Sequence, residues 1–131
     1  MSNRKQISAE KRKEALKKVA FAKLNRYMGS PRKARLVADL VRGMDVEYAL
    51  HVLKHTPNKT AEPIYKLLLS AMANWEAKNE GKRIDETSLY IKEIFVNGGR
   101  MLKRIQPAPQ GRAHRIRKRS SHITLIVDEK E

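Results

Sequence analysis

A run of positive charge near the C-terminus constrains the fold of this chain more than any other feature. Between Arg100 and Arg119 there are eight Lys or Arg residues and no Asp or Glu. The run lies between two apolar segments that have the composition of strands, residues 89–96 and 123–127. Like charges that face each other across a strand pair are destabilising. A fold that keeps this segment must therefore match its charge with something outside the protein.

The charged run itself is predicted to form a β-hairpin. Pro107, Pro109 and Gly111 cluster at its middle, and these residue types are typical of a turn. We therefore expect residues 99–121 to form a protruding arm, with about ten residues on each side and a reach of about 30 Å. Because an isolated two-stranded ribbon is marginally stable in water, we expect the arm to become fully ordered only against a polyanion.

The centre of the chain is predicted to be helical. Ser30 and Pro31 are typical of a helix start, and Gly43 is placed to end that helix. Its apolar residues recur at helical spacing: Leu36, Val37, Leu40 and Val41. A second, short helix is expected to point four residues inward: Val46, Ala49, Leu50 and Leu53. The third and longest helix carries one wide apolar face: Ile64, Leu67, Leu68, Ala71, Met72 and Trp75.

Strand-like alternation predicts a small sheet next to these helices. It occurs at residues 89–96 and 123–127 and, more weakly, at Ala20, Ala22 and Leu24. The expected fold is α+β, with three helices packed on a small antiparallel three-stranded sheet and a long protruding basic β-hairpin. A chain of 131 residues can bury one modest core. We therefore expect a single domain over residues 18–131, preceded by a basic, partly disordered extension over residues 1–17.

The net charge of +15 is concentrated at the two ends of the chain. Residues 1–35 carry twelve cations against two acids, residues 36–99 carry eight against nine, and residues 100–131 carry nine against three. A protein that needs charge only for solubility interleaves the two signs, so this distribution favours a polyanion as partner. The absence of cysteine excludes a disulfide framework and fits a reducing, cytoplasmic compartment. No apolar run is long enough to span a bilayer.

Catalytic and metal chemistry find little support in the sequence. His51 and His55 lie four residues apart on a helix and could share a metal ion, but no third ligand with a recognisable spacing accompanies them. Ser120, Ser121 and His122 are neighbours in a strand-like segment, where successive side chains point to opposite faces and cannot form a nucleophile pair. We therefore expect no enzyme activity, no cofactor and no metal.

Three segments carry a resemblance to a known family: SPRKARLVADLVRG (residues 30–43), AMANWEAKN (71–79) and MLKRIQPAPQGRAHRIRKRSSHITLIV (101–127). The chain resembles the bacterial large-subunit ribosomal protein L22 (uL22) family over about residues 18–128. The resemblance implies an α+β body bound to 23S-type ribosomal RNA early in subunit assembly, with a hairpin that reaches the wall of the nascent-peptide exit tunnel. It further implies a monomer within the cytoplasmic ribosome, whose partners are neighbouring large-subunit proteins and the nascent polypeptide, with no membrane.

The same resemblance implies roles for individual residues. The implied contacts to ribosomal RNA are Arg26, Arg32, Lys33, Arg35, Arg100, Lys103, Arg104, Arg112, Arg115, Arg117, Lys118 and Arg119. The implied tunnel-facing tip is Gln106, Pro107, Ala108, Pro109, Gln110, Gly111 and Arg112. The tip departs from the common family pattern P-R-A-K-G-R-A, because Ala108 and Gln110 stand where that pattern has basic residues.

An alternative interpretation is an architectural DNA-binding protein. Basic β-arms with proline at the tip can also enter the minor groove of DNA. Such proteins usually dimerise and bind DNA of any sequence. Dimerisation, with DNA affinity and no preference for RNA, would favour this class over a ribosomal protein.

Overall fold

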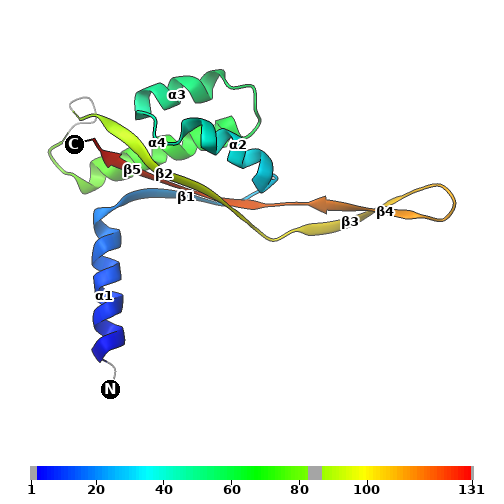
Figure 1. The fold of residues 1–131 in the computed structure, drawn as a ribbon, viewed down its shortest axis with the longest axis horizontal. Coiled ribbons are helices and arrows are strands. Elements are labelled where there is room, and N and C mark those ends of the chain that lie inside the picture. Colours follow the sequence, from blue (N-terminus) through cyan, green and yellow to red (C-terminus); the bar gives the residue numbers. More distant parts are fainter. Residues whose placement is uncertain (1–2, 83–86, 131) are drawn as a thin grey trace.

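The computed structural model describes residues 3–82 and 87–130, which form an α+β body with two projections (Figure 1). The elements are α1 (Asn3–Lys18), β1 (Ala20–Tyr27), α2 (Pro31–Val41), α3 (Val46–His55), α4 (Ala61–Lys78), β2 (Leu89–Gly98), β3 (Leu102–Pro107), β4 (Ala113–Lys118) and β5 (Ser121–Glu129). The predicted α+β class is confirmed. The predicted number of three helices is wrong, because within the described residues α1 is a fourth.

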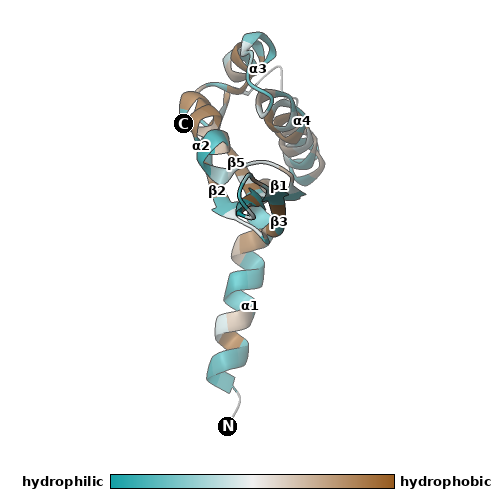
Figure 2. Cartoon of the chain, turned by 90° about the vertical axis from the view of Figure 1, so that its right-hand side faces the viewer, coloured by the Kyte–Doolittle hydropathy of each residue, from teal (hydrophilic) through white to brown (hydrophobic). Residues whose placement is uncertain are grey.

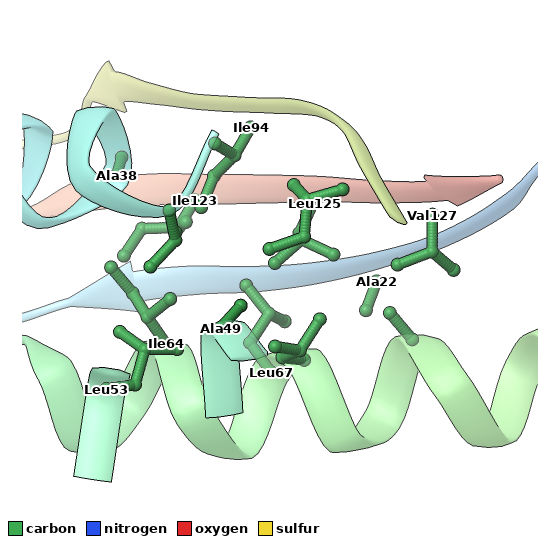
Figure 3. Close-up of a cluster of buried hydrophobic side chains, with 14 of the residues drawn as sticks. Ala22, Ala38, Ala49, Leu53, Ile64, Leu67, Ile94, Ile123, Leu125 and Val127 are labelled. Atoms are coloured by element: carbon green, nitrogen blue, oxygen red, sulfur yellow. The ribbon is translucent and has the colours of Figure 1, made fainter. Parts of the chain in front are cut away.

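The body contains a three-stranded antiparallel sheet, as predicted from the alternating segments, and its strand order is β1-β5-β2. The central strand β5 buries Ile123, Leu125 and Val127 on one side. Helices α2, α3 and α4 lie on this side of the sheet, and the opposite face is not covered by a helical layer (Figures 1 and 2). Figure 3 shows these β5 side chains packed between the sheet and α4.

The apolar face predicted for α4 is confirmed, but the one predicted for α2 is partly wrong. On α4 the buried residues are Ile64, Leu67, Leu68, Ala71 and Trp75, with Met72 partly buried. On α2 the buried residues are Ala34, Val37, Ala38 and Val41, while Leu36 and Leu40 of the predicted stripe are 69% and 43% exposed. The two alanines let α2 approach the sheet closely, and this turns the larger Leu36 outward.

Gly43 ends α2 in the left-handed conformation, as predicted, with φ of 76°. The chain is then fixed to the sheet, because the Gly43 N–H donates to the Ile91 carbonyl at 3.0 Å and the Ile91 N–H donates to the Met44 carbonyl at 2.9 Å. These bonds hold the segment after α2 against the beginning of β2. The helical layer and the edge of the sheet are thus joined by backbone as well as by core packing.

The predicted arm is confirmed as a separate two-stranded ribbon of β3 and β4, which projects from one end of the sheet (Figure 1). Its register runs from Leu102↔Lys118 to Pro107↔Ala113. Each paired strand has six residues, fewer than the ten expected per side. The difference arises because residues 99–101 and 119–120 join the arm to the sheet and residues 108–112 form its turn.

The first helix, α1, is the second projection. It leaves the sheet at the end opposite the arm and points away from the helical layer (Figures 1 and 2). None of its residues is buried, and the Lys78 ammonium fixes its base by donating to the carbonyls of Leu16 at 3.4 Å and Val19 at 2.6 Å. The structure thus has a helix where the sequence suggested a partly disordered extension, and the order of this segment without RNA stays a prediction. Across the described residues, no helix combines the length and apolarity needed to cross a membrane.

Candidate nucleic-acid interface

The arm brings together five of the predicted RNA-contacting cations on two paired strands. These are Lys103, Arg104, Arg115, Arg117 and Lys118, and all are exposed. Lys103 lies directly opposite Arg117, so two like charges face each other across the ribbon. No Lys or Arg of the described arm pairs with a carboxylate, because every ion pair of the described residues lies in the body. An external polyanion would remove this repulsion.

The tip is a tight turn whose backbone is closed by the Ala108 N–H, which donates to the Arg112 carbonyl at 2.8 Å. Gln110 and Gly111 both have positive φ, 63° and 68°. Glycine adopts this conformation freely, whereas for glutamine it is uncommon. The structure therefore brings the predicted tip residues 106–112 together at the end of the ribbon, where Arg112 is the one charged side chain.

At the root of the arm, Arg100 and Arg119 lie exposed on either side of the bend. The Ser120 hydroxyl donates to the Arg100 carbonyl at 2.5 Å, and the Gly99 N–H donates to the Ser120 carbonyl at 2.8 Å. A Cβ on Gly99 would lie only 2.6 Å from Ser120 Oγ, so a larger residue would displace this hydroxyl from its position beside the Arg100 carbonyl. Ser120 is thus engaged in fixing the bend and is not placed as a nucleophile.

Arg26 lies at a β-bulge in β1, between Leu24 and Tyr27. Its φ of 57° is in the left-handed region, and its N–H donates to His122 Nδ1 at 3.1 Å. The side chain is exposed. A bulge redirects side chains at the margin of a sheet, and here it places a cation beside the first residues of β5, next to the root of the arm.

Arg32 and Lys33 lie in the first turn of α2 and are exposed. Cations are disfavoured at a helix N-terminus, where the helix dipole is positive and favours anions. Neither of these side chains has an acidic partner among the described ion pairs. The start of α2 therefore adds a second group of uncompensated positive charge that an external phosphate could neutralise.

Arg35 differs from the other predicted contacts, because its guanidinium binds the backbone of another element, whereas Arg104 Nη1 donates only to the carbonyl of the adjacent Lys103, at 2.8 Å. Arg35 Nε and Nη2 donate to the Val96 carbonyl at 3.2 and 3.0 Å. Two turns further along the helix, Arg42 Nη2 donates to the Ile94 carbonyl at 2.8 Å. Both carbonyls belong to β2, an edge strand of the sheet. Arg35 thus fixes α2 to the strand that leads into the arm.

We predict opposite effects for two neighbouring arginine variants of α2. Arg35→Ala is expected to lower the free energy of unfolding by about 1–2 kcal/mol, because it removes charge-assisted hydrogen bonds to Val96. Arg32→Ala is expected to change it by less than about 0.5 kcal/mol but to weaken binding to ribosomal RNA. Urea denaturation followed by circular dichroism, together with filter binding, measures both effects. Equal unfolding free energies for the two variants would contradict the prediction.

The acidic residues of the body are largely paired with cations of the body. Lys92 donates a hydrogen bond to Asp128, which lowers the pKa of that carboxyl and raises the pKa of the ammonium. A hydrogen bond from Lys66 likewise lowers the pKa of Glu62. These pairs are exposed, so each adds little to stability. Because these acids are paired within the body, they do not neutralise the cations of the arm.

The described residues do not assemble a metal site. No group of three or more His, Asp or Glu side chains among them could hold an ion. His55 Nδ1 lies 2.8 Å from the His51 carbonyl and donates to it, so this nitrogen is engaged by the helix backbone. The His55 side chain is therefore hydrogen-bonded to the backbone of His51.

Sequence reasoning missed two residues on the uncovered face of the sheet, Lys23 and Phe95. Their strands β1 and β2 both pair with β5, and both residues lie opposite Thr124. Strict alternation could have found them, since each stands between residues that face the core or its margin. The prediction of these strands used only the apolar residues that face the core. The side chains that alternate with them were not considered.

The structure is thus that of a small, basic α+β protein. Unpaired cations of the described residues lie on the projecting arm, at the bulge of β1 and at the start of α2. A family model described as "Ribosomal protein L22p/L17e" matches residues 22–128. Similar relatives are named large ribosomal subunit protein uL22. The one from Christiangramia forsetii is 60% identical over 127 residues, which are 97% of this chain and 94% of the relative. The one from Bacteroides fragilis (strain YCH46) is 58% identical over 130 residues, 99% of this chain and 95% of the relative.

The chain therefore belongs to the ribosomal protein L22p/L17e family, which confirms the resemblance seen in its sequence. This is a family of structural, non-enzymatic ribosomal proteins, so the prediction that the chain is not an enzyme is also confirmed. The family model begins at residue 22, but the match to the Bacteroides fragilis relative covers 99% of the chain. The segment that forms α1 is thus included in that match.

Proposed function

We propose that this protein is a structural component of the large ribosomal subunit that binds 23S-type ribosomal RNA. The arm and the start of α2 bind the RNA, the protein supports subunit assembly, and residues 106–112 line the nascent-peptide exit tunnel. It acts as a monomer in the cytoplasmic ribosome, beside neighbouring large-subunit proteins and the nascent polypeptide. The observation that carries the proposal is the row of eight arm cations that have no carboxylate partner among the described residues.

Release of counterions from RNA supplies the binding free energy in this proposal. Each Lys or Arg that neutralises a phosphate displaces condensed cations, so log affinity falls with log salt concentration by roughly 0.7–0.9 per neutralised phosphate. Five of the seven cations in residues 103–119 are arginines. Their planar guanidinium groups bind phosphate oxygens in pairs and stack on unpaired bases. The arm therefore recognises the shape of folded RNA as well as its charge.

The tip of this chain carries less charge than the common pattern of the family. Ala108 and Gln110 leave Arg112 as the single cation of the turn, so electrostatic attraction to the tunnel wall depends on that residue. The two prolines limit the conformations of the turn and reduce the entropy lost on insertion between RNA segments. A rigid, weakly charged tip suits a position where a growing chain of any sequence must pass.

Arg112→Ala is expected to change the chemical reactivity of ribosomal RNA at the tunnel wall while leaving the joining of the two subunits intact. The variant removes the only tip charge, and the arm strands and body are unaffected. Chemical probing of ribosomes assembled with the variant, together with sedimentation of subunits, measures both. Gln110→Ala, which changes a neutral side chain of the same turn, serves as the matched control. Identical probing patterns for the two variants would contradict an interaction of Arg112 with the tunnel wall.

Affinity purification discriminates the ribosomal function from the architectural DNA-binding alternative. The tagged protein is purified from its own cells at moderate salt, and the nucleic acid that accompanies it is sequenced. We expect large-subunit ribosomal RNA in a particle of subunit size. Mixed genomic DNA, recovered with a free protein dimer, would contradict the ribosomal function and identify the arm as a DNA-bending device.

A further inference from the structure

The face of the sheet that lies opposite α2, α3 and α4 is bordered by the two projections of the molecule. The arm extends from one end of the sheet, and α1 leaves the other end, on the side away from the helices (Figures 1 and 2). Helix α1 carries seven Lys or Arg and two Glu, and the arm carries eight cations and no acid. This face therefore lies between two basic projections.

Phe95 is the large apolar side chain that this face exposes. Its neighbours in β2, Ile94 and Val96, are buried beneath the helices, so the pleat turns Phe95 to the opposite side. The side chain is 41% exposed. Phe21 of β1 has two ammonium groups over its ring, those of Lys23 and Lys78, whereas Phe95 has no such interaction among the described residues.

The part of this face that adjoins the arm is positively charged. Lys23 lies in the same row as Phe95, with its ammonium 5.2 Å from the centroid of the Phe21 ring, and the exposed Arg26 lies at the bulge further along β1. Neither forms an ion pair among the described residues. Glu93, two residues before Phe95 in β2, is an exposed acid on the side of Phe95 away from the arm. The acidic residues of β5 lie still further toward that end of the sheet, where Asp128 is paired with Lys92. An exposed ring is thus combined with these two cations at the root of the arm.

We propose that Phe95 is a stacking site for an unpaired base of single-stranded RNA, and that Lys23 and Arg26 bind phosphates of the same strand. Unpaired bases stack on aromatic side chains of open sheet faces, and a basic surface beside such a ring is the combination found in single-strand binding. The charge of the surface and its continuity with the arm favour RNA over an apolar protein partner. The inference rests on the proposed binding to ribosomal RNA and adds to it a specific site outside the arm.

Substitutions of Phe95 in the full chain test the stacking site. Phe95→Ala is expected to bind in vitro transcribed large-subunit ribosomal RNA about tenfold more weakly, because one stacked base is released. Phe95→Tyr retains the ring and is expected to bind as the wild type does. The slope of log affinity against log salt is expected to be unchanged in both variants, because every phosphate-binding cation is retained. Binding to a fully paired RNA duplex, which offers no unpaired base, is expected to be equal for all three proteins.

Fluorescence provides a direct readout of stacking. In the Phe95→Trp variant, an indole placed at position 95 is expected to be quenched by ribosomal RNA but not by the duplex. Trp75 is buried in the core and supplies a constant background. Thermal melts followed by circular dichroism establish that each variant is folded before binding is measured.

Two outcomes would overturn the stacking site. One is wild-type affinity of Phe95→Ala for ribosomal RNA, which is also the result expected if a neighbouring protein covers this face. The other is an unquenched Phe95→Trp variant in the bound state. Failure of the proposed function gives a different result, because the wild type would then show no preference for ribosomal RNA over the duplex.

Discussion

Replacement of residues 101–119 by an Asn-Gly turn is expected to leave a folded body that binds ribosomal RNA on the order of a thousandfold more weakly near physiological salt. The deletion removes seven of the eight arm cations. None of the buried residues lies in the deleted segment. The sheet keeps its last pair, Gly98↔Ser121, and the hydrogen bond from the Gly99 N–H to the Ser120 carbonyl.

Far-ultraviolet circular dichroism and filter binding over a range of salt concentrations measure the two halves of this prediction. The slope of log affinity against log salt is expected to become shallower by roughly 0.7–0.9 for each phosphate that the deletion leaves without a cation. A matched control keeps the arm at full length and changes its seven cations to Gln, which separates removal of charge from removal of the ribbon. Full-strength binding by the deletion would show that the body alone holds the RNA.

The elements that were predicted correctly are those in which local pattern and tertiary packing agree. The stripe of α4 runs from Ile64 to Trp75, about three helical turns, so one missing position does not change the direction of its apolar face. The arm was predicted because Pro107, Pro109 and Gly111 are typical of a turn and lie at the middle of a segment between two strand-like runs. In both cases the local residues leave few alternative structures.

The errors arose where packing between elements decides the outcome. The stripe on α2 was assigned from its largest apolar residues, but Ala34 and Ala38 pack against the sheet and leave Leu36 exposed. Close approach of a helix to a sheet depends on both surfaces, and the sequence of one helix does not contain that information. Helix α1 has no buried face at all, so apolar periodicity could not predict it.

The sequence predicted the charge of the candidate site, but it did not predict which of its side chains form hydrogen bonds within the protein. The positions of the cations follow from the sequence, but the engagement of Arg35 by the Val96 carbonyl requires the packing of α2 on β2. Similarly, the exposure of Phe95 follows only once the helices are known to cover the other face of the sheet. Among the predicted RNA-binding residues, available side chains can therefore be separated from engaged ones only in the folded structure.

Leu125→Ala is expected to lower the free energy of unfolding by about 2–5 kcal/mol. Leu125 is fully buried on the central strand β5, opposite Ala22 of β1 and Ile94 of β2. The decrease combines the transfer of apolar atoms with the cavity left between the sheet and the helices. Because a small domain is stable by only about 5–15 kcal/mol, the variant loses a large part of its stability. Urea denaturation of the free protein measures the difference.

Leu36→Ala is the matched control, since it deletes the same atoms from a side chain that is 69% exposed. Its expected effect is below about 0.5 kcal/mol, because those atoms are already largely in water. The two variants together test the packing of α2, on which the sequence pattern and the structure disagree. Similar decreases in the free energy of unfolding for both variants would mean that α2 buries its leucines. The helix would then be rotated, Arg32 and Arg35 would lie elsewhere, and the hydrogen bonds that fix α2 to the strand leading into the arm would be absent.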